Sequence, residues 1–186
     1  MNLSQQVTGS NKGIGLTIAK NLCSQFDGDV YVTSRDESRG IAAVEELKQL
    51  GLKPKFFQLD ICDETSILKL RDFLKSNYGG LDVLVNNAAI AMLGEEATAN
   101  PEIAATTMKT NFFGTLSACK ILFPILLPHA RVVNMSSCMG HLGTFIRGTK
   151  KAAVDLKNKF SSNSLTEQEL YDLVQDYIEY IGQDAL

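Results

Sequence analysis

The sequence lacks paired cysteines, a clustered basic face and any long apolar run, and each absence excludes a class of protein. Its four cysteines show no C-x-x-C spacing and no zinc-like spacing with the two histidines, so we expect reduced thiols and no metal. Lysine and arginine are scattered and the net charge is -3, which argues against a nucleic-acid surface. No uncharged apolar run approaches the ~20 residues of a membrane span, and MNLSQQVTGS has no leader-like region. We therefore expect a cytoplasmic protein with no nucleic-acid or membrane partner.

The distribution of apolar residues predicts an α/β fold. The 186 residues, 45% hydrophobic and 21% charged, fit one domain, residues 1–186, with an ordinary core. Strand-length apolar runs alternate with helical periodicity, the pattern of repeated βαβ units. We predict strands at Asp29–Ser34, Lys55–Asp60, Leu81–Asn86 and Arg131–Ser136, and helices at Glu37–Leu50 and Glu64–Tyr78. The expected architecture is a doubly wound, Rossmann-like parallel sheet with strand order 3-2-1-4-5, incomplete at the C-terminus. Its first strand, LSQQV, is unusually polar for a central strand.

Residues 141–186 read as a polar, insertion-like segment followed by an amphipathic helix. Ser164-x-x-Glu167 predicts a capping box at the start of this helix. The helix has one apolar stripe, formed by Leu170, Leu173, Val174, Tyr177, Ile178 and Ile181. We expect it to pack loosely.

The stretch TGSNKGIGLTIAK places Gly9, Gly13 and Gly15 directly before a helix. Glycine lets the backbone turn tightly and approach a pyrophosphate, whose charge is met by free N–H groups and the positive end of the helix dipole. The pattern therefore predicts a dinucleotide cradle. The alternative is a tight strand-to-helix turn that binds no ligand.

The end of the second strand carries arginines. Arg35 lies 20 residues after Gly15, where an NAD site usually presents an acidic residue to the ribose hydroxyls. Together with Arg39 and Lys12, it is suited to a 2′-phosphate through charge-assisted hydrogen bonds, which favours NADP. The alternative is that both arginines only solvate a helix N-terminus, although cations there oppose the helix dipole.

Two further strand ends carry polar or small side chains. Asp60, before Ile61, follows the third strand, and its carboxylate can accept a hydrogen bond from an adenine amino group. Asn87 and Ala88 follow the fourth strand. Ligands of open α/β sheets bind outside the carboxyl ends of the strands, so we expect these residues in the same site.

Several motifs together resemble the short-chain dehydrogenase/reductase family. They are Thr8-Gly9-x-x-x-Gly13-x-Gly15, Asp60, Asn86-Asn87-Ala88, Asn111 and Ser137. YGGLDVLVNNA, MKTNFFGT and RVVNMSS resemble more narrowly its monomeric, NADPH-dependent carbonyl reductases. The resemblance implies NADP(H) as cofactor and reduction of aldehydes, ketones or quinones. It also implies that Asn111 holds a water in a proton relay and that Ser137 hydrogen-bonds the substrate carbonyl.

The sequence departs from the family pattern in its proton donor. In that family a tyrosine, activated by a lysine four residues later, supplies the proton, and no tyrosine here has that partner. We therefore expect a truncated chain that is essentially inactive, with Ser137 capping a turn. The alternative function is an inactive truncated or splice-variant chain acting as a nucleotide-binding or interaction module. The strand Arg131–Ser136 is then an exposed edge through which copies self-associate.

The remaining chemistry-bearing residues have modest expectations. Ala89 replaces the glycine usual after Asn-Asn-Ala. Cys138 admits a redox role, but a small buried or half-buried thiol is favoured. His129 and His141 are expected in surface loops. The candidate cofactor-binding residues are Gly9, Asn11, Lys12, Gly13, Ile14, Gly15, Arg35, Arg39, Asp60, Ile61, Asn87 and Ala88, and the candidate catalytic residues are Ser137 and Asn111.

Overall fold

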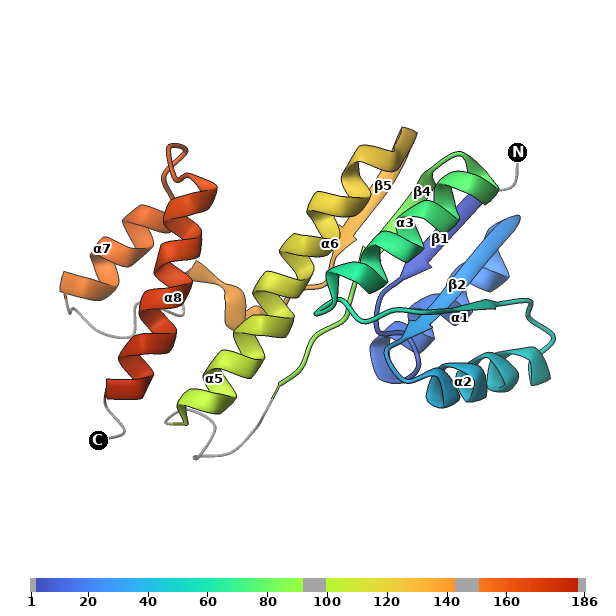
Figure 1. The fold of residues 1–186 in the computed structure, drawn as a ribbon, viewed down its shortest axis with the longest axis horizontal. Coiled ribbons are helices and arrows are strands. Elements are labelled where there is room, and N and C mark those ends of the chain that lie inside the picture. The colour runs from blue at the N-terminus through green and yellow to red at the C-terminus, as the bar shows by residue number, and fades with distance from the viewer. Residues whose placement is uncertain (1–2, 92–99, 143–150, 184–186) are drawn as a thin grey trace. The chain divides into compact units, whose positions relative to one another are not determined.

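A computed structural model describes residues 3–91, 100–142 and 151–183. The chain divides into two compact units, residues 1–92 with 106–135 and residues 93–105 with 136–186. In the described part, the first unit holds a five-stranded parallel sheet of order β3-β2-β1-β4-β5 (Figure 1). Its strands are β1 (Leu3–Val7), β2 (Gly28–Ser34), β3 (Lys55–Gln58), β4 (Leu81–Asn86) and β5 (Leu126–Asn134). The predicted fold class and strand order are confirmed.

Helices cover both faces of this sheet (Figure 1). The helices of the first unit include α1 (Gly13–Gln25), α2 (Glu37–Gln49), α3 (Glu64–Tyr78) and α6 (Thr115–Leu122). One apolar cluster joins α1 and α2 to the valines of β1, β2 and β4, such as Val7 and Val32. The other joins α3 and α6 to leucines that include Leu84. Side chains that alternate along one strand therefore serve two cores, as in a doubly wound sheet.

Local signals set the ends of the crossover helices. The Asp36 carboxylate caps α2 by accepting from the Arg39 main-chain nitrogen at 3.0 Å. Asp63 caps α3 in the same way. Gly79 ends α3 with φ 77°, a left-handed conformation that glycine adopts without steric cost. These ends agree with the predicted helices, except that α2 stops one residue earlier.

The polar segment LSQQV does form the central strand β1, between β2 and β4. The polar groups of Ser4 have partners at the start of β4: its main-chain nitrogen lies 2.8 Å from Asp82 Oδ2, and its hydroxyl donates to Gly80 O at 3.1 Å. Gln5 and Gln6 are 1% and 0% exposed, and their side-chain amides have no partner in the described part of the chain. β1 is thus held by its main-chain ladders in spite of its side chains.

Three strands have bounds that differ from the prediction. β2 begins one residue earlier, at Gly28. β3 stops at Gln58 rather than Asp60, because the Asp60 carboxylate turns the chain by accepting from Cys62 N at 2.9 Å. β5 runs over Leu126–Asn134 instead of Arg131–Ser136, because the chain already pairs with β4 ahead of a register shift. His129, predicted in a loop, lies exposed within β5 and has φ 70°.

The second unit contains η3 (Cys138–Gly140), α7 (Lys151–Phe160) and α8 (Glu167–Gln183). α8 was predicted and α7 was not. The capping box was misplaced, because Thr166 caps α8: its hydroxyl oxygen accepts from Glu169 N at 3.2 Å, and its own nitrogen donates to Glu169 Oε2 at 2.8 Å. Cys138 is exposed, so the prediction of a half-buried thiol was wrong. No described helix is long and apolar enough to cross a membrane.

Between β4 and α6, the chain also forms α5 (Pro101–Met108) and the π-helical turn η1 (Lys109–Gly114). The short 3-10 helix η2 (Phe123–Ile125) leads from α6 into β5.

Candidate functional site

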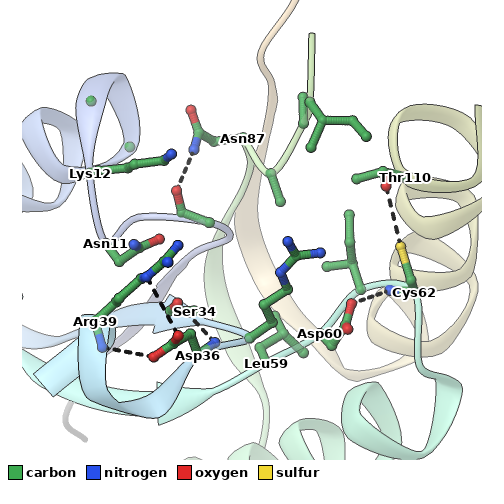
Figure 2. A pocket seen from close by; sticks show the side chains of 18 of the residues that line it. Asn11, Lys12, Ser34, Asp36, Arg39, Leu59, Asp60, Cys62, Asn87 and Thr110 are labelled. Carbon is green, nitrogen blue, oxygen red and sulfur yellow. Dashed lines mark hydrogen bonds and ion pairs between the residues drawn. The ribbon is translucent and has the colours of Figure 1, made fainter. Parts of the chain in front are cut away.

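A cavity of about 480 Å³ lies at the carboxyl ends of the strands of the first unit (Figure 2). It is formed by the glycine turn after β1 and by the segments that follow β2, β3 and β4. All twelve residues predicted to bind a cofactor line it. Seven further residues line the cavity and were not predicted from the sequence: Ser34, Asp36, Leu59, Cys62, Ala89, Ile90 and Thr110. This edge is where open α/β sheets bind ligands.

The glycines of the turn are required for two different reasons. Gly9 and Gly13 have φ 61° and 58°, in the left-handed region that favours glycine. Gly15 is required by close approach instead. A Cβ at Gly15 would lie 2.4 Å from Asn87 Nδ2 and 2.8 Å from Gly9 O, so no larger residue fits without a shift.

A hydrogen-bond network holds this turn against β2 and β4. The Thr8 hydroxyl oxygen accepts from the main-chain nitrogens of Asn87 and the residue after it, both at 2.9 Å. Asn87 Nδ2 in turn donates to Thr8 O at 2.9 Å and to Gly9 O at 3.2 Å. On the other side, Ser10 Oγ accepts from Thr33 N at 2.9 Å. Thr8 and Ser10 are thus positioning residues, and their signal was the TGS sequence itself.

The N-terminus of α1 opens at the glycine turn without a side-chain cap. The capping position is Lys12, whose side chain makes no capping hydrogen bond, and the first turn contains no acidic residue. The first N–H groups of a helix have no partner within the helix, and they carry the positive end of its dipole. This helix end is therefore suited to an anion such as a phosphate.

Three cations and two carboxylates line the cavity: Lys12, Arg35 and Arg39, and Asp36 and Asp60. The side chains of Lys12 and Arg35 make no hydrogen bond or ion pair with any described residue, and Arg39 Nε lies 3.5 Å from Asp36 Oδ2. Hydrogen bonds from the Ser38 hydroxyl and the Arg39 main chain hold the pKa of Asp36 below its ordinary value, so this carboxyl is ionised. The three positive side chains exceed the two carboxylates of the lining, which favours an anionic ligand.

Asp60 lies on the wall that follows β3. One of its carboxylate oxygens accepts from Cys62 N at 2.9 Å, and its own nitrogen donates to Ser66 Oγ at 3.0 Å. These bonds fix the carboxylate at the cavity wall. The thiol of Cys62 lies 3.5 Å from the Thr110 hydroxyl, which joins this wall to η1.

Asn111, a candidate catalytic residue of the first unit, lies behind the cavity lining rather than in it. The Asn111 amide is bound at both atoms by the main chain of Ile90: its Nδ2 donates to Ile90 O and its Oδ1 accepts from Ile90 N, each at 2.8 Å. Ile90 does line the cavity, so Asn111 positions this wall. Ser137 belongs to the second unit, where its carbonyl oxygen accepts from Gly140 N at 2.9 Å. A water held by Asn111 and a substrate contact of Ser137 stay predictions.

Among the described residues of the first unit, Lys55 contacts two tyrosines, Tyr31 and Tyr78, and this group lies away from the cavity. Lys55 Nζ is 3.4 Å from the Tyr78 hydroxyl, which donates to Asp29 Oδ2 at 2.6 Å and lies 2.7 Å from the Tyr31 hydroxyl. Burial raises the pKa of both phenols, and the hydrogen bonds of Tyr31 to Tyr78 and of Tyr78 to Asp29 raise the pKa of Tyr31 and Tyr78, respectively, which keeps them protonated. Asp29 and Lys55 are near the amino ends of their strands, whereas the cavity is at the carboxyl ends. This pair therefore stabilises the sheet rather than serving a ligand in the cavity.

The described residues contain no group of three or more histidine, cysteine or acidic side chains that could hold a metal ion.

Comparisons with known proteins give a consistent result. The family model described as short chain dehydrogenase matches residues 6–164. The chain is similar to human carbonyl reductase (NADPH) 1 and mouse carbonyl reductase (NADPH) 3, at 51% and 50% identity over 173 residues. Each alignment covers 93% of this chain and 61% of the relative, so the chain spans about three fifths of the curated relatives' length. A solved structure, menthone neomenthol reductase from Mentha piperita, matches 100% of this chain and 76% of its own, with 30% identity and a TM-score of 0.85.

Proposed function

Because this chain belongs to the short-chain dehydrogenase family, we propose that its cavity binds NADP(H) and that its activity is reduction of carbonyl compounds, namely aldehydes, ketones or quinones. The curated relatives, which are named as NADPH carbonyl reductases, support this. The observation that carries the proposal is one cavity with two phosphate-binding features. It has an uncapped helix N-terminus at the glycine turn, and three cations beside it.

Each part of the cavity has a proposed role. The glycine turn and the start of α1 bind the pyrophosphate. Arg35 and Arg39 bind the 2′-phosphate. Asp60 accepts a hydrogen bond from the adenine amino group. Asn87 keeps the turn open to the ligand, since its amide is bound to the main chain of that turn. Such a cofactor supplies a hydride to a carbonyl carbon. Asn111 and Ser137 are proposed to position the water and the carbonyl oxygen.

The proton step is proposed to be deficient in a chain of these 186 residues, because the sequence contains no Tyr-x-x-x-Lys. General acid catalysis contributes typically ~10²–10⁴-fold, so turnover is expected near background. The alternative function is a nucleotide-binding or interaction module. We further propose that copies of the chain associate through β5, the edge strand of the described sheet, and that the protein is cytoplasmic.

Replacing Arg35 tests the cofactor assignment. The Arg35→Gln variant removes a charge-assisted contact to the 2′-phosphate, so its affinity for NADPH should fall about 10- to 100-fold while its affinity for NADH stays unchanged. Isothermal titration calorimetry with both nucleotides gives the two dissociation constants.

Lys53→Gln is the matched control, because it removes an exposed cation that does not line the cavity. It should bind NADPH like the unmodified chain. Equal affinities of the unmodified chain for NADPH and NADH would contradict the assignment of Arg35.

A further inference from the structure

Of the two carboxylates that line the cavity, Asp36 is the one paired with a lining cation, and both of its oxygens contact Arg39. Oδ1 accepts from the Arg39 main-chain nitrogen at 3.0 Å and from the Ser38 hydroxyl at 2.7 Å. Oδ2 lies 3.5 Å from Arg39 Nε. A single side chain therefore caps α2 and fixes the direction of the guanidinium that leaves its first turn (Figure 2).

Arg39 has little else to hold it. Its side chain is 70% exposed and makes no other hydrogen bond or ion pair with a described residue. Figure 2 shows its guanidinium beside Asn11, on the glycine-turn side of the cavity. Because Asp36 is bound near Nε, the two terminal nitrogens of Arg39 stay available as the paired donors that a phosphate accepts from.

We propose that Asp36 is a positioning residue for Arg39 and thereby contributes to the preference for a 2′-phosphorylated nucleotide; this rests on the proposed function. A long, exposed arginine populates many rotamers, and ordering it on binding lowers affinity. The ion pair with Asp36 orders it before the ligand arrives. Asp36 acts through Arg39 and needs no contact with the nucleotide.

A carboxylate near a phosphate also repels it, so Asp36 has two opposing effects on the affinity for a 2′-phosphate. The charge of Asp36 is already compensated by two hydrogen-bond donors and the N-terminus of α2, the same contacts that lower its pKa. Its nearest cation is the arginine that it orients. We therefore expect the gain in affinity from orienting Arg39 to exceed the loss from repulsion between Asp36 and the phosphate.

Asp36→Asn separates these contributions, because asparagine caps a helix about as well as aspartate but lacks the charge that holds the guanidinium. The probes are adenosine 2′,5′-bisphosphate and 5′-AMP, which differ only by the 2′-phosphate, measured by calorimetry. We expect the bisphosphate to bind about 2- to 5-fold more weakly, the range of an exposed ion pair, and 5′-AMP to bind unchanged. Circular dichroism melting confirms that the variant folds.

A double-mutant cycle with Arg39→Gln shows whether Asp36 acts through Arg39. In the Arg39→Gln background, Asp36→Asn should have no further effect on bisphosphate affinity. An equal loss in both backgrounds, or tighter binding by Asp36→Asn alone, overturns the proposal and leaves the proposed cofactor in place. If the unmodified chain does not prefer the bisphosphate to 5′-AMP, the proposed function fails and this inference fails with it.

Discussion

At the scale of single residues, the cavity depends on a close approach at Gly15. A Cβ there would meet Asn87 Nδ2 at 2.4 Å, Gly9 O at 2.8 Å and Ser10 Cα at 2.9 Å, and two of these are main-chain atoms that cannot rotate away. Gly15→Ala should therefore displace the glycine turn, weaken NADPH binding by more than about 10-fold and lower the free energy of unfolding by about 1–3 kcal/mol. Calorimetry and urea unfolding measure the two effects.

Gly51→Ala is the contrasting variant. Gly51 has φ 79°, and a Cβ added there would meet no atom within 4 Å, so alanine strains the backbone without a clash. It lies outside the cavity lining. It should lower stability and leave NADPH affinity intact, and normal NADPH affinity in Gly15→Ala would show that the turn tolerates a side chain.

At the scale of elements, β1 is the strand in which side chains and position disagree. Gln6 is paired with Tyr31 of β2 and Leu84 of β4, fully buried, with both amide atoms unpartnered among the described residues. An unsatisfied buried polar group costs about 1–3 kcal/mol. Gln6→Leu should therefore raise the free energy of unfolding by about 1–3 kcal/mol, measured as a higher urea midpoint at unchanged m-value.

Gln49→Leu serves as its control, because Gln49 is exposed on α2 and its amide is not desolvated. This change should leave stability within about 0.5 kcal/mol. A loss of stability in Gln6→Leu would mean that the buried amide has a partner, such as an ordered water.

At the scale of the whole chain, binding and turnover are expected to separate. Residues 1–186 should bind NADPH yet consume it with a reactive quinone at a rate near background, because no Tyr-x-x-x-Lys is present. They should also associate with rising concentration, since β5 lies at the edge of the described sheet and its Val133 is 45% exposed. Absorbance at 340 nm and light scattering follow the two properties. Rapid turnover by a monomer would show that another residue donates the proton.

The sequence predicted the framework because its signals are local. The alternation of strands and helices, the aspartate caps and the glycine stops each depend on a few neighbouring residues. Predictions went wrong where a longer-range contact decided the outcome. β5 begins early because Leu126 pairs with Leu81. The capping box of α8 is the exception, a local error: Ser164-x-x-Glu167 and Thr166-x-x-Glu169 both fit the pattern, and the helix starts at Glu167.

The fold class, the strand order and twelve of the residues that line the cavity could be predicted from the amino-acid sequence, because in a parallel sheet all strand ends of one polarity meet at one edge. What those side chains do at the cavity was settled in three dimensions. Asn87 supports a turn 79 residues away, and Asn111 is hydrogen-bonded to Ile90 across 21 residues. Such contacts depend on distances of a few tenths of an ångström between distant segments, which periodicity and residue type do not encode.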